Sequence, residues 1–177
     1  MLSAQDIIDH FKLEPLPVEG GIFYQTYQSP EVIASSALPE RYQLQKPMGT
    51  AIVYLYLPEF DSFSAMHKLP TDEIYHFYLG DPVELLQLYP SGETQRVILG
   101  QDILNGQQVQ YVAPKDVWQG SYLLPGGKFA LIGTTMAPGF TEDDYIGGDR
   151  SELEEKYPAE AELIRRLTRP DAPLRMI

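Results

Sequence analysis

The stretch of sequence that decides the fold runs His67-Lys68-Leu69-Pro70-Thr71-Asp72-Glu73-Ile74-Tyr75-His76-Phe77-Tyr78-Leu79-Gly80. It places a histidine and a carboxylate on either side of a turn, and then continues as an aromatic strand that ends at a glycine. Two of the chain's three histidines lie inside it. This pattern predicts a small β-barrel with a polar site at its mouth, but it does not name the molecule that the site handles.

The geometry of the turn decides whether this site forms. Pro70 stands where a turn favours a fixed φ angle, so a loop of three residues over 70–72 would pair 69 with 73 and 67 with 75. Side chains alternate along a strand, and this register would place four side chains on one face: His67, Leu69, Glu73 and Tyr75. A loop of two residues would pair 68 with 73, and the histidine and the glutamate would then lie on different faces.

The middle of the chain, over about 20–140, reads as a series of short strands separated by turn-forming residues. Each segment is rich in β-branched and aromatic residues, and clusters of Gly, Pro, Asn or Asp stand between them. The expected strands cover 22–27, 50–57, 73–79, 83–89, 95–99, 109–112 and 129–136. Since no helical pattern intervenes, the spacing favours an antiparallel sandwich or barrel over a parallel sheet.

Helices are expected at both ends of a single domain that spans 1–177. Ser3 is a favourable N-cap for a short amphipathic helix over about 3–11. The tail over about 149–169 also has a helical pattern, with Ser151 as the expected cap and Pro158 dividing it in two. We expect this charged tail to pack on the outside of the sheet or on a partner chain.

Composition excludes several classes of function. Thirteen basic and 25 acidic residues give a net charge of −12, which makes nucleic acid and anionic membranes poor partners. The chain has no cysteine, so disulfides, thiolate metal sites and cysteine nucleophiles are excluded. No signal peptide or long apolar run is recognisable, and we therefore expect a cytoplasmic protein without a membrane span.

The candidate site has three chemical interpretations. His67 and Glu73 could coordinate a divalent metal, act as a general base with its orienting carboxylate, or form a buried hydrogen bond that serves structure only. Tyrosine combines an apolar ring with a polar tip, which suits a ligand cavity, so Tyr24, Thr26 and Tyr54 are candidates to line it. His76 lies three residues from Glu73 and is expected to face the opposite side.

The residues also carry a resemblance to a known family. Glu73 followed after six residues by Gly80 resembles the first signature of the cupin superfamily, with His67 at its first metal-ligand histidine. The whole chain, over roughly 5–147, looks like the small Cupin_5 branch. The matching stretches are Glu19–Tyr27, His67–Pro82, Ile98–Gly100, Val112–Pro114 with Trp118-Gln119, and Ala137–Phe140. This resemblance implies a mainly β fold, a double-stranded β-helix (a jelly-roll cupin barrel), and a homodimer.

The chain departs from the superfamily pattern at two metal positions. Leu69 stands where the resemblance places the second histidine, and Gln119, after Pro114, stands where it places the third. A histidine, a glutamate and an amide are a poor ligand set for zinc, iron or manganese. A divalent metal would have to be held by His67, Glu73, Gln119 and added waters.

Three functions follow for a cupin that binds a small molecule. The first is a metal-independent epimerase or isomerase acting on a sugar-like or carbonyl-containing metabolite. His67 would be the base that removes a proton next to the carbonyl group, and Glu73 would orient or polarise that group. The alternative is a non-catalytic module that binds a metabolite through Tyr24, Tyr54, Tyr75 and Gln119. The second alternative is a metal-dependent oxygenase or isomerase. Fold likeness alone does not choose among them.

Overall fold

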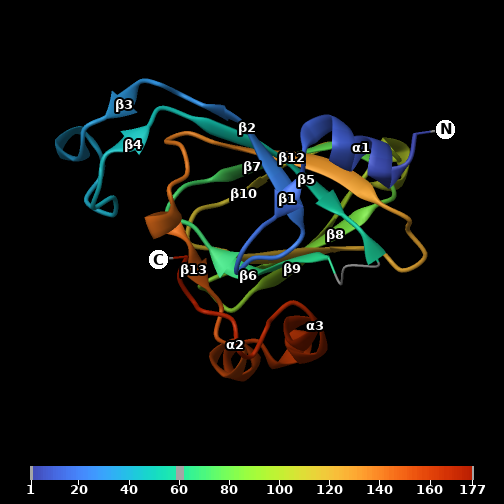
Figure 1. Cartoon of the computed structure of the whole chain (residues 1–177). Helices are drawn as coiled ribbons and strands as arrows, with labels where there is room; N and C mark the ends of the chain where they lie inside the picture. The colour runs from blue at the N-terminus through green and yellow to red at the C-terminus, as the bar shows by residue number, and fades with distance from the viewer. Residues whose placement is uncertain (1, 59–61, 177) are drawn as a thin grey trace.

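The body of the protein is a sandwich of two antiparallel β-sheets, with helices on the outer surfaces of both (Figure 1). The computed structural model describes residues 2–58 and 62–176. This architecture confirms the predicted fold class, a mainly β jelly roll with a short N-terminal helix and a C-terminal helical tail. Among the described residues, none of the helices has the length and apolar character needed to cross a membrane.

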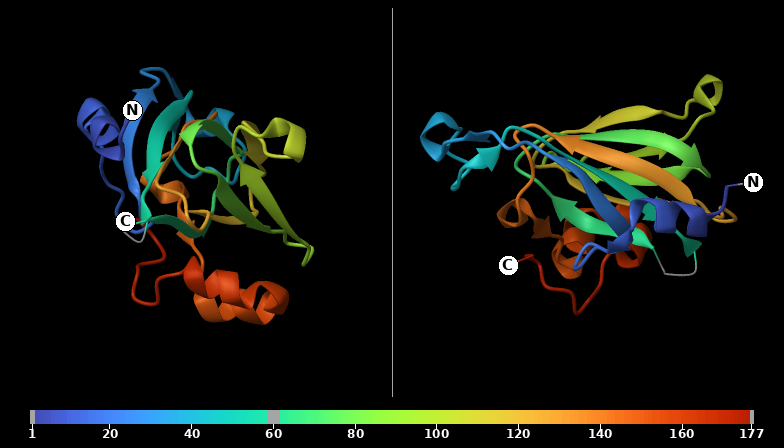
Figure 2. Two further views of the ribbon diagram at one scale, coloured as in Figure 1. Left: turned by 90° about the vertical axis from the view of Figure 1, so that its right-hand side faces the viewer. Right: turned by 45° about the horizontal axis from the view of Figure 1, so that its top comes forward.

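The larger sheet has six strands and the smaller has five. In spatial order, the larger contains β1 (Glu14–Pro15), β2 (Ile22–Gln28), β5 (Thr50–Tyr56), β12 (Ala130–Met136), β7 (Glu73–Gly80) and β10 (Gln110–Ala113). The smaller contains β13 (Ile146–Gly147), β6 (Phe63–Lys68), β11 (Trp118–Leu123), β8 (Val83–Leu88) and β9 (Thr94–Leu99). A separate hairpin of β3 (Val32–Ile33) and β4 (Lys46–Pro47) projects from one end of the sandwich, as Figures 1 and 2 show.

Alternation along the strands builds the core between the sheets. Strand β5 directs Tyr54 and Tyr56 inward, where they join a buried cluster with Val83 and Leu85 of β8. Between these inward positions, Leu55 belongs to a second buried cluster on the outer surface of the larger sheet. A strand that is buried on both faces reads as a continuous apolar run, which is why 50–57 was recognisable in the sequence.

The N-terminal helix α1 (Ala4–Phe11) forms as expected and covers the outer surface of the larger sheet. The Ser3 hydroxyl accepts a hydrogen bond from the Asp6 amide, and the Asp6 carboxylate accepts one from the Ser3 amide. Ile7 is 3% exposed and packs with the outward residues of β5 and β12. Burying one such side chain stabilises the fold by about 1.5–3 kcal/mol.

The tail forms two short helices, α2 (Arg150–Lys156) and α3 (Ala161–Arg166), on the outer surface of the smaller sheet. Their residues Leu153 and Ile164 share a buried cluster with Leu86 and Leu88 of β8, which confirms packing on the sheet. The predicted cap, Ser151, is wrong. The carboxylate of Asp149 accepts the hydrogen bond from the Glu152 amide, so the helix begins one residue after Asp149.

The predicted hairpin between His67 and Glu73 is also wrong. Strands β6 and β7 belong to different sheets, and the loop between them crosses the edge of the sandwich. Side chains of this loop hold the crossing: Thr71 bonds the Tyr42 hydroxyl at 2.5 Å, and Asp72 accepts a hydrogen bond from the Lys115 amide. A short turn between two strands usually forms a hairpin. The residues that anchor this loop are distant in sequence, so the sequence around the loop did not indicate that it crosses between the sheets.

Strand β11 was not among the expected strands, although it forms the middle of the smaller sheet. Its sequence Trp118-Gln119-Gly120-Ser121-Tyr122-Leu123 contains three residues with little preference for strands. Pairing with β6 on one side and β8 on the other stabilises it instead. This strand places Gln119 in the interior, between the two sheets.

Candidate functional site

His67 lies on β6 and points into the space between the sheets, with only 2% of its surface exposed. Its Nδ1 is 2.8 Å from the Ala65 carbonyl oxygen. Because that oxygen can only accept, Nδ1 carries a proton and donates it. The ring stacks on Tyr145 with 5.2 Å between centroids, so the imidazole is held from two sides and Nε2 is directed inward.

Glu73 reaches the same place from the opposite sheet, at the first position of β7. Its Oε2 lies 3.9 Å from His67 Nε2, too far for a direct hydrogen bond. Gln119 bridges the two. Its Nε2 donates to Glu73 Oε2 at 2.6 Å and lies 3.2 Å from His67 Nε2. When the ring is neutral, His67 Nε2 accepts a hydrogen bond from this amide.

A second carboxylate, Glu19, lies close to this pair and was not among the predicted site residues. It is partly buried and lines the same cavity, and it accepts a hydrogen bond from the Ser64 hydroxyl at 2.6 Å. Gly20 and Gly21, which follow it, both have positive φ angles that glycine adopts without strain. The Gly-Gly pair after Glu19 is the feature of the sequence that could have predicted this position, because it indicates a bend that can direct the glutamate side chain inward.

The two carboxylates change the acid–base properties of the site. Burial alone lowers the pKa of His67, but the charges of Glu19 and Glu73 outweigh it and raise the pKa to about 9. Burial also raises the pKa of Glu19, against the opposing effect of His67. The N–H of Gln119 that faces His67 Nε2 favours the neutral ring. The imidazole is therefore a strong base with two anions placed to stabilise its protonated form.

These groups lie at the inner end of a cavity of about 660 Å³. This volume lies within the range of about 300–1,000 Å³ that is typical of small-molecule sites. Its walls are largely apolar, and they include Leu16, Phe23, Leu44, Ile52, Met136 and Phe140. The lining also includes residues 50–52 of the larger sheet and residues 140–143 of the segment that precedes β13.

The charge along the cavity is negative. Four carboxylates line it, Glu19 and Glu73 at the inner end and Glu142 and Asp143 further out. Among the described residues that line it, none is lysine or arginine. Lys46 lies nearby but is fully buried, and its ammonium pairs with Asp143 at 2.9 Å and Asp144 at 2.7 Å. The charge of Lys46 is therefore already neutralised by its own partners.

Comparison with known proteins agrees with this architecture. The Cupin_5 profile, described as cupin superfamily (DUF985), matches residues 5–146. The chain belongs to the cupin superfamily. The uncharacterised protein YML079W of Saccharomyces cerevisiae is 29% identical over 151 residues, covering 81% of this chain and 74% of the yeast protein.

Two solved structures share the fold of this cupin along nearly its whole length. Protein SO0799 of Shewanella oneidensis superposes with a TM-score of 0.83 at 29% identity, covering 97% of this chain and 100% of the other. A hypothetical protein from Leishmania major has a TM-score of 0.81 at 24% identity, covering 94% and 99%. Neither name states an activity, so the site must be interpreted from its own geometry.

The predicted site residues of this cupin fall into separate groups. His67, Glu73 and Gln119 meet as described, although His67 and Glu73 do so across two sheets and not along a hairpin. Tyr54 and Tyr75 are buried in the core behind the cavity and are absent from its lining. The Tyr54 hydroxyl donates to the Gly20 carbonyl at 2.7 Å, which supports the bend after Glu19.

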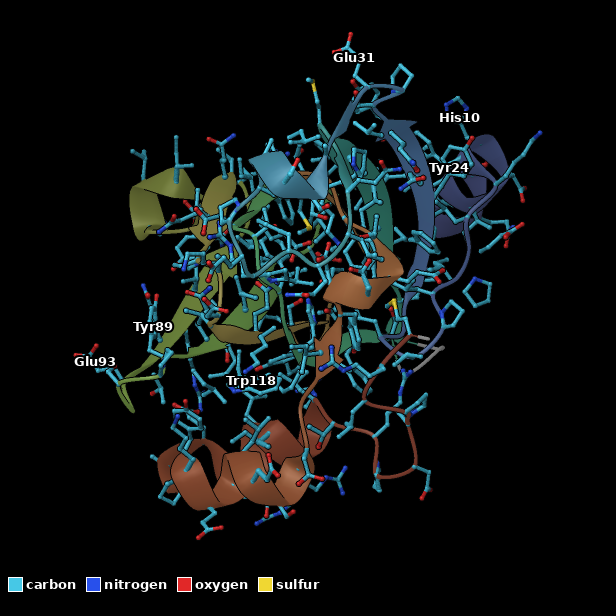
Figure 3. All side chains as sticks on the ribbon, turned by 90° about the vertical axis from the view of Figure 1, so that its left-hand side faces the viewer. His10, Tyr24, Glu31, Tyr89, Glu93 and Trp118 are labelled. Carbon is cyan, nitrogen blue, oxygen red and sulfur yellow. The ribbon has the colours of Figure 1, made fainter. Side chains whose placement is uncertain are left out.

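Tyr24 and Thr26 do not enter the cavity, so their predicted placement is wrong. Tyr24 is 47% exposed, and Thr26 bonds the Ala51 carbonyl at the protein surface. Figure 3 shows Tyr24 on the outer strand β2, close to α1. The alternate residues of β2, Phe23 and Gln25, line the cavity instead. The predicted tyrosine and threonine share a face, but the period of two alone does not say which face is inside.

His76 is directed away from the site, as its spacing from Glu73 predicted. Its Nε2 lies 3.0 Å from the Thr135 hydroxyl, and its Nδ1 lies 3.3 Å from Gln110 Nε2 on the outer side of the larger sheet. His10 lies near the end of α1 and is exposed (Figure 3). Neither histidine contacts the cavity.

The donor set of this cupin does not fit a resident divalent metal. Leu69, where the resemblance places an imidazole, is 5% exposed and lines the cavity with an apolar side chain. Gln119 turns its amide nitrogen, not its oxygen, toward both His67 and Glu73. Among the described residues, no cluster of three or more histidine or acidic side chains has a geometry suited to a metal ion.

Proposed function

We propose that this cupin binds a small metabolite without phosphate groups and catalyses its isomerisation or epimerisation by acid–base chemistry. The observation that supports it is the imidazole of His67, placed at the end of the cavity between the carboxylates of Glu19 and Glu73. In its neutral form, an imidazole of this basicity can remove a proton from the carbon next to a carbonyl group. The carboxylates stabilise the imidazolium that results.

The proposed reaction only moves protons on the carbon and oxygen atoms next to the substrate carbonyl. His67 Nε2, in the neutral form of the ring, takes the proton from the carbon next to the carbonyl. The electron pair of the broken C–H bond moves to the carbonyl oxygen as an enolate. For an isomer, the hydroxyl proton of the deprotonated carbon moves to the enolate oxygen, that carbon becomes the new carbonyl, and the imidazolium gives its proton to the former carbonyl carbon. For an epimer, solvent protonates the other face of the deprotonated carbon, and His67 releases its proton to solvent. The reaction is redox-neutral.

The charge of the cavity restricts the class of substrate. A phosphate or pyrophosphate group would face the carboxylates of Glu19, Glu73 and Glu142, beside an Asp143 that is paired with Lys46, without a lysine or arginine among the described lining residues. Like charges in a low-dielectric cavity repel strongly. The apolar walls and the hydroxyls of Thr50 and Thr134 suit an uncharged sugar-like molecule, or a cationic one, better than a nucleotide-linked sugar.

Solvent deuterium incorporation tests this function even when the product is unidentified. The protein is incubated in D₂O with free aldoses and ketoses, and with the 6-phosphate of each as the charged counterpart. Deuterium incorporated next to the carbonyl of an uncharged sugar, lost in His67→Ala and kept in Tyr24→Phe, is the expected result. Tyr24→Phe is the control because Tyr24 lies on the outer surface.

Two other results would assign a different function. A metabolite that copurifies with the protein but exchanges no proton would make this a non-catalytic binding module. About one metal per chain in natively purified protein, lost in His67→Ala, would favour the metal-dependent oxygenase or isomerase. Both measurements use the full chain as purified.

We also propose that the protein forms a homodimer through the β3–β4 hairpin. This hairpin projects from the sandwich (Figure 2) and exposes apolar side chains, with Val32 52%, Leu44 56% and Met48 49% exposed. Exposed apolar groups that gather on one projection are typical of interaction surfaces. Sedimentation of the wild type and of a Leu44→Glu, Met48→Glu variant tests this, with a monomer expected for the variant only.

A further inference from the structure

A row of polar side chains crosses the inner face of the smaller sheet, with one residue on each of four neighbouring strands. His67 on β6 is paired in register with Gln119 on β11, Gln119 with Gln87 on β8, and Gln87 with Gln95 on β9. Val83 and Leu85, which precede Gln87 on the inner face of β8, belong to the apolar core. The row therefore connects the site to the far edge of the smaller sheet through an apolar interior.

Two amide atoms in this row have no hydrogen-bond partner among the described residues: Gln119 Oε1 and Gln87 Nε2. Gln119 is 2% exposed and Gln87 is fully buried. One of these atoms is an acceptor and the other is a donor, and they belong to residues directly opposite each other on adjacent strands. A buried amide group without a partner costs about 1–3 kcal/mol, so the two atoms are natural partners for each other or for a shared water.

The remaining atoms of both amides are already bonded, which fixes the direction of each side chain. Gln87 Oε1 accepts from the Tyr111 hydroxyl at 2.7 Å and also lies 3.0 Å from the Tyr89 hydroxyl. The Gln87 amide nitrogen is therefore free to donate elsewhere. At the other end, Gln119 Nε2 donates to Glu73 and leaves its oxygen for an outside donor. Every bond of this series donates toward Glu73, and hydrogen bonds aligned in this way strengthen one another.

We propose that Gln87 is a positioning residue that orients the amide of Gln119 through a hydrogen bond, direct or through one water, from Gln87 Nε2 to Gln119 Oε1. The bond keeps the amino group of Gln119 directed at Glu73 and His67. Without it the amide can turn over, which would place its oxygen against the Glu73 carboxylate. The inference rests on one part of the proposed function, namely that His67 and Glu73 form the functional site. Gln119 contacts both of these residues.

Side-chain amide NMR tests this arrangement without a substrate. The Nε2 proton of Gln119 that faces the Glu73 carboxylate is expected well downfield of an exposed glutamine, as a charge-assisted hydrogen bond requires. In Gln87→Leu the two Nε2 protons of Gln119 are expected to move toward the values of a free glutamine. Unchanged Gln119 resonances in this variant would overturn the proposal.

Gln95→Leu is the control for the contacts with these tyrosines. Gln95 Oε1 shares the hydroxyls of Tyr89 and Tyr111 with Gln87, but Gln95 is exposed and lies one strand further from Gln119. Loss of the contacts with Tyr89 and Tyr111 would shift the Gln119 resonances in both variants, whereas loss of the orienting bond shifts them in Gln87→Leu alone. Equal shifts in both variants would therefore also contradict the proposal.

A neutron structure of the wild type keeps the proposal testable if Gln87→Leu does not fold, because it locates the hydrogens that define the amide orientation. Gln119 Oε1 is expected within hydrogen-bond distance of Gln87 Nε2, or of one water bonded to both. An amide oxygen directed at Glu73 would overturn the proposal. Neither measurement depends on turnover, so a failure of the proposed isomerase activity would be recognised separately.

Discussion

His67 Nε2 and Glu73 Oε2 lie 3.9 Å apart, although the two residues belong to different sheets of the sandwich. Only the crossing loop 69–72 joins their strands, so their approach depends on how the two sheets pack. Gln119 spans the gap between them with its amide nitrogen. The geometry of the site therefore depends on the tertiary structure. Its acid–base properties should change when any of the three side chains is replaced.

Removing the charge of Glu73 should lower the pKa of His67. The carboxylates of Glu19 and Glu73 raise that pKa to about 9 against the effect of burial. In Glu73→Gln one of the two anions is lost, so the midpoint of the His67 ring titration, followed by NMR, should fall. Glu142→Gln at the outer part of the cavity is the control and should leave the midpoint close to the wild-type value. Equal shifts in the two variants would contradict a local effect of Glu73.

The stability of the protein should fall as pH rises through the range set by His67. The folded-state pKa of about 9 lies above the ordinary value of 6.5, so folding favours the protonated ring. The stabilisation is fully present below about 6.5 and is lost as pH rises through about 9. A difference of this size corresponds to on the order of 3 kcal/mol. Urea unfolding at several pH values should show this decline in the wild type and a flatter profile in His67→Gln.

Restoring the two missing imidazoles should create a metal site. Leu69 lines the cavity, and Gln119 touches both His67 and Glu73, so a Leu69→His, Gln119→His variant would direct three imidazoles and one carboxylate into one space. Such a set is well suited to zinc. Elemental analysis should find about one metal per chain in the variant and much less in the wild type. Adding His67→Ala should remove the metal, and retention would show that it binds elsewhere.

Much of the fold could be predicted because it depends on local patterns. The N-terminal helix has its cap and its apolar face within residues 3–11, and β5 is apolar on both faces. The route of the chain after His67 could not be predicted in the same way. The anchors of the crossing loop come from Tyr42 and Lys115, which are more than 25 residues away in sequence.

The candidate site likewise contains residues that the sequence predicted and residues that it did not. His67 and Glu73 were found because their residue types and spacing indicate chemistry, and Gln119 was found through the resemblance to the cupin pattern. Glu19 was missed because its inward direction depends on the bend at Gly20 and on Ser64. Tyr24 was misplaced because a strand with a mixture of polar and aromatic residues on both faces gives no sign of which face is buried.

Loss of the Tyr54 hydroxyl should destabilise the segment that carries Glu19. The hydroxyl donates to the buried Gly20 carbonyl at 2.7 Å, and Tyr54→Phe leaves that carbonyl without this donor. A decrease in the free energy of unfolding of about 1–3 kcal/mol is expected, measured by urea titration. Tyr24→Phe removes a hydroxyl from an exposed ring and should change stability little. Equal losses in the two variants would show that the buried bond contributes nothing specific.

The cap of α2 should be Asp149 and not Ser151. The Asp149 carboxylate accepts from the Glu152 amide at 3.0 Å, and its negative charge lies at the positive end of the helix. Asp149→Ala should therefore lower the free energy of unfolding by about 1 kcal/mol. Ser151 contributes through its hydroxyl, which bonds Asp149, so Ser151→Ala should have a smaller effect. Thermal unfolding of the two variants decides between the caps, and a larger loss in Ser151→Ala would reverse the assignment.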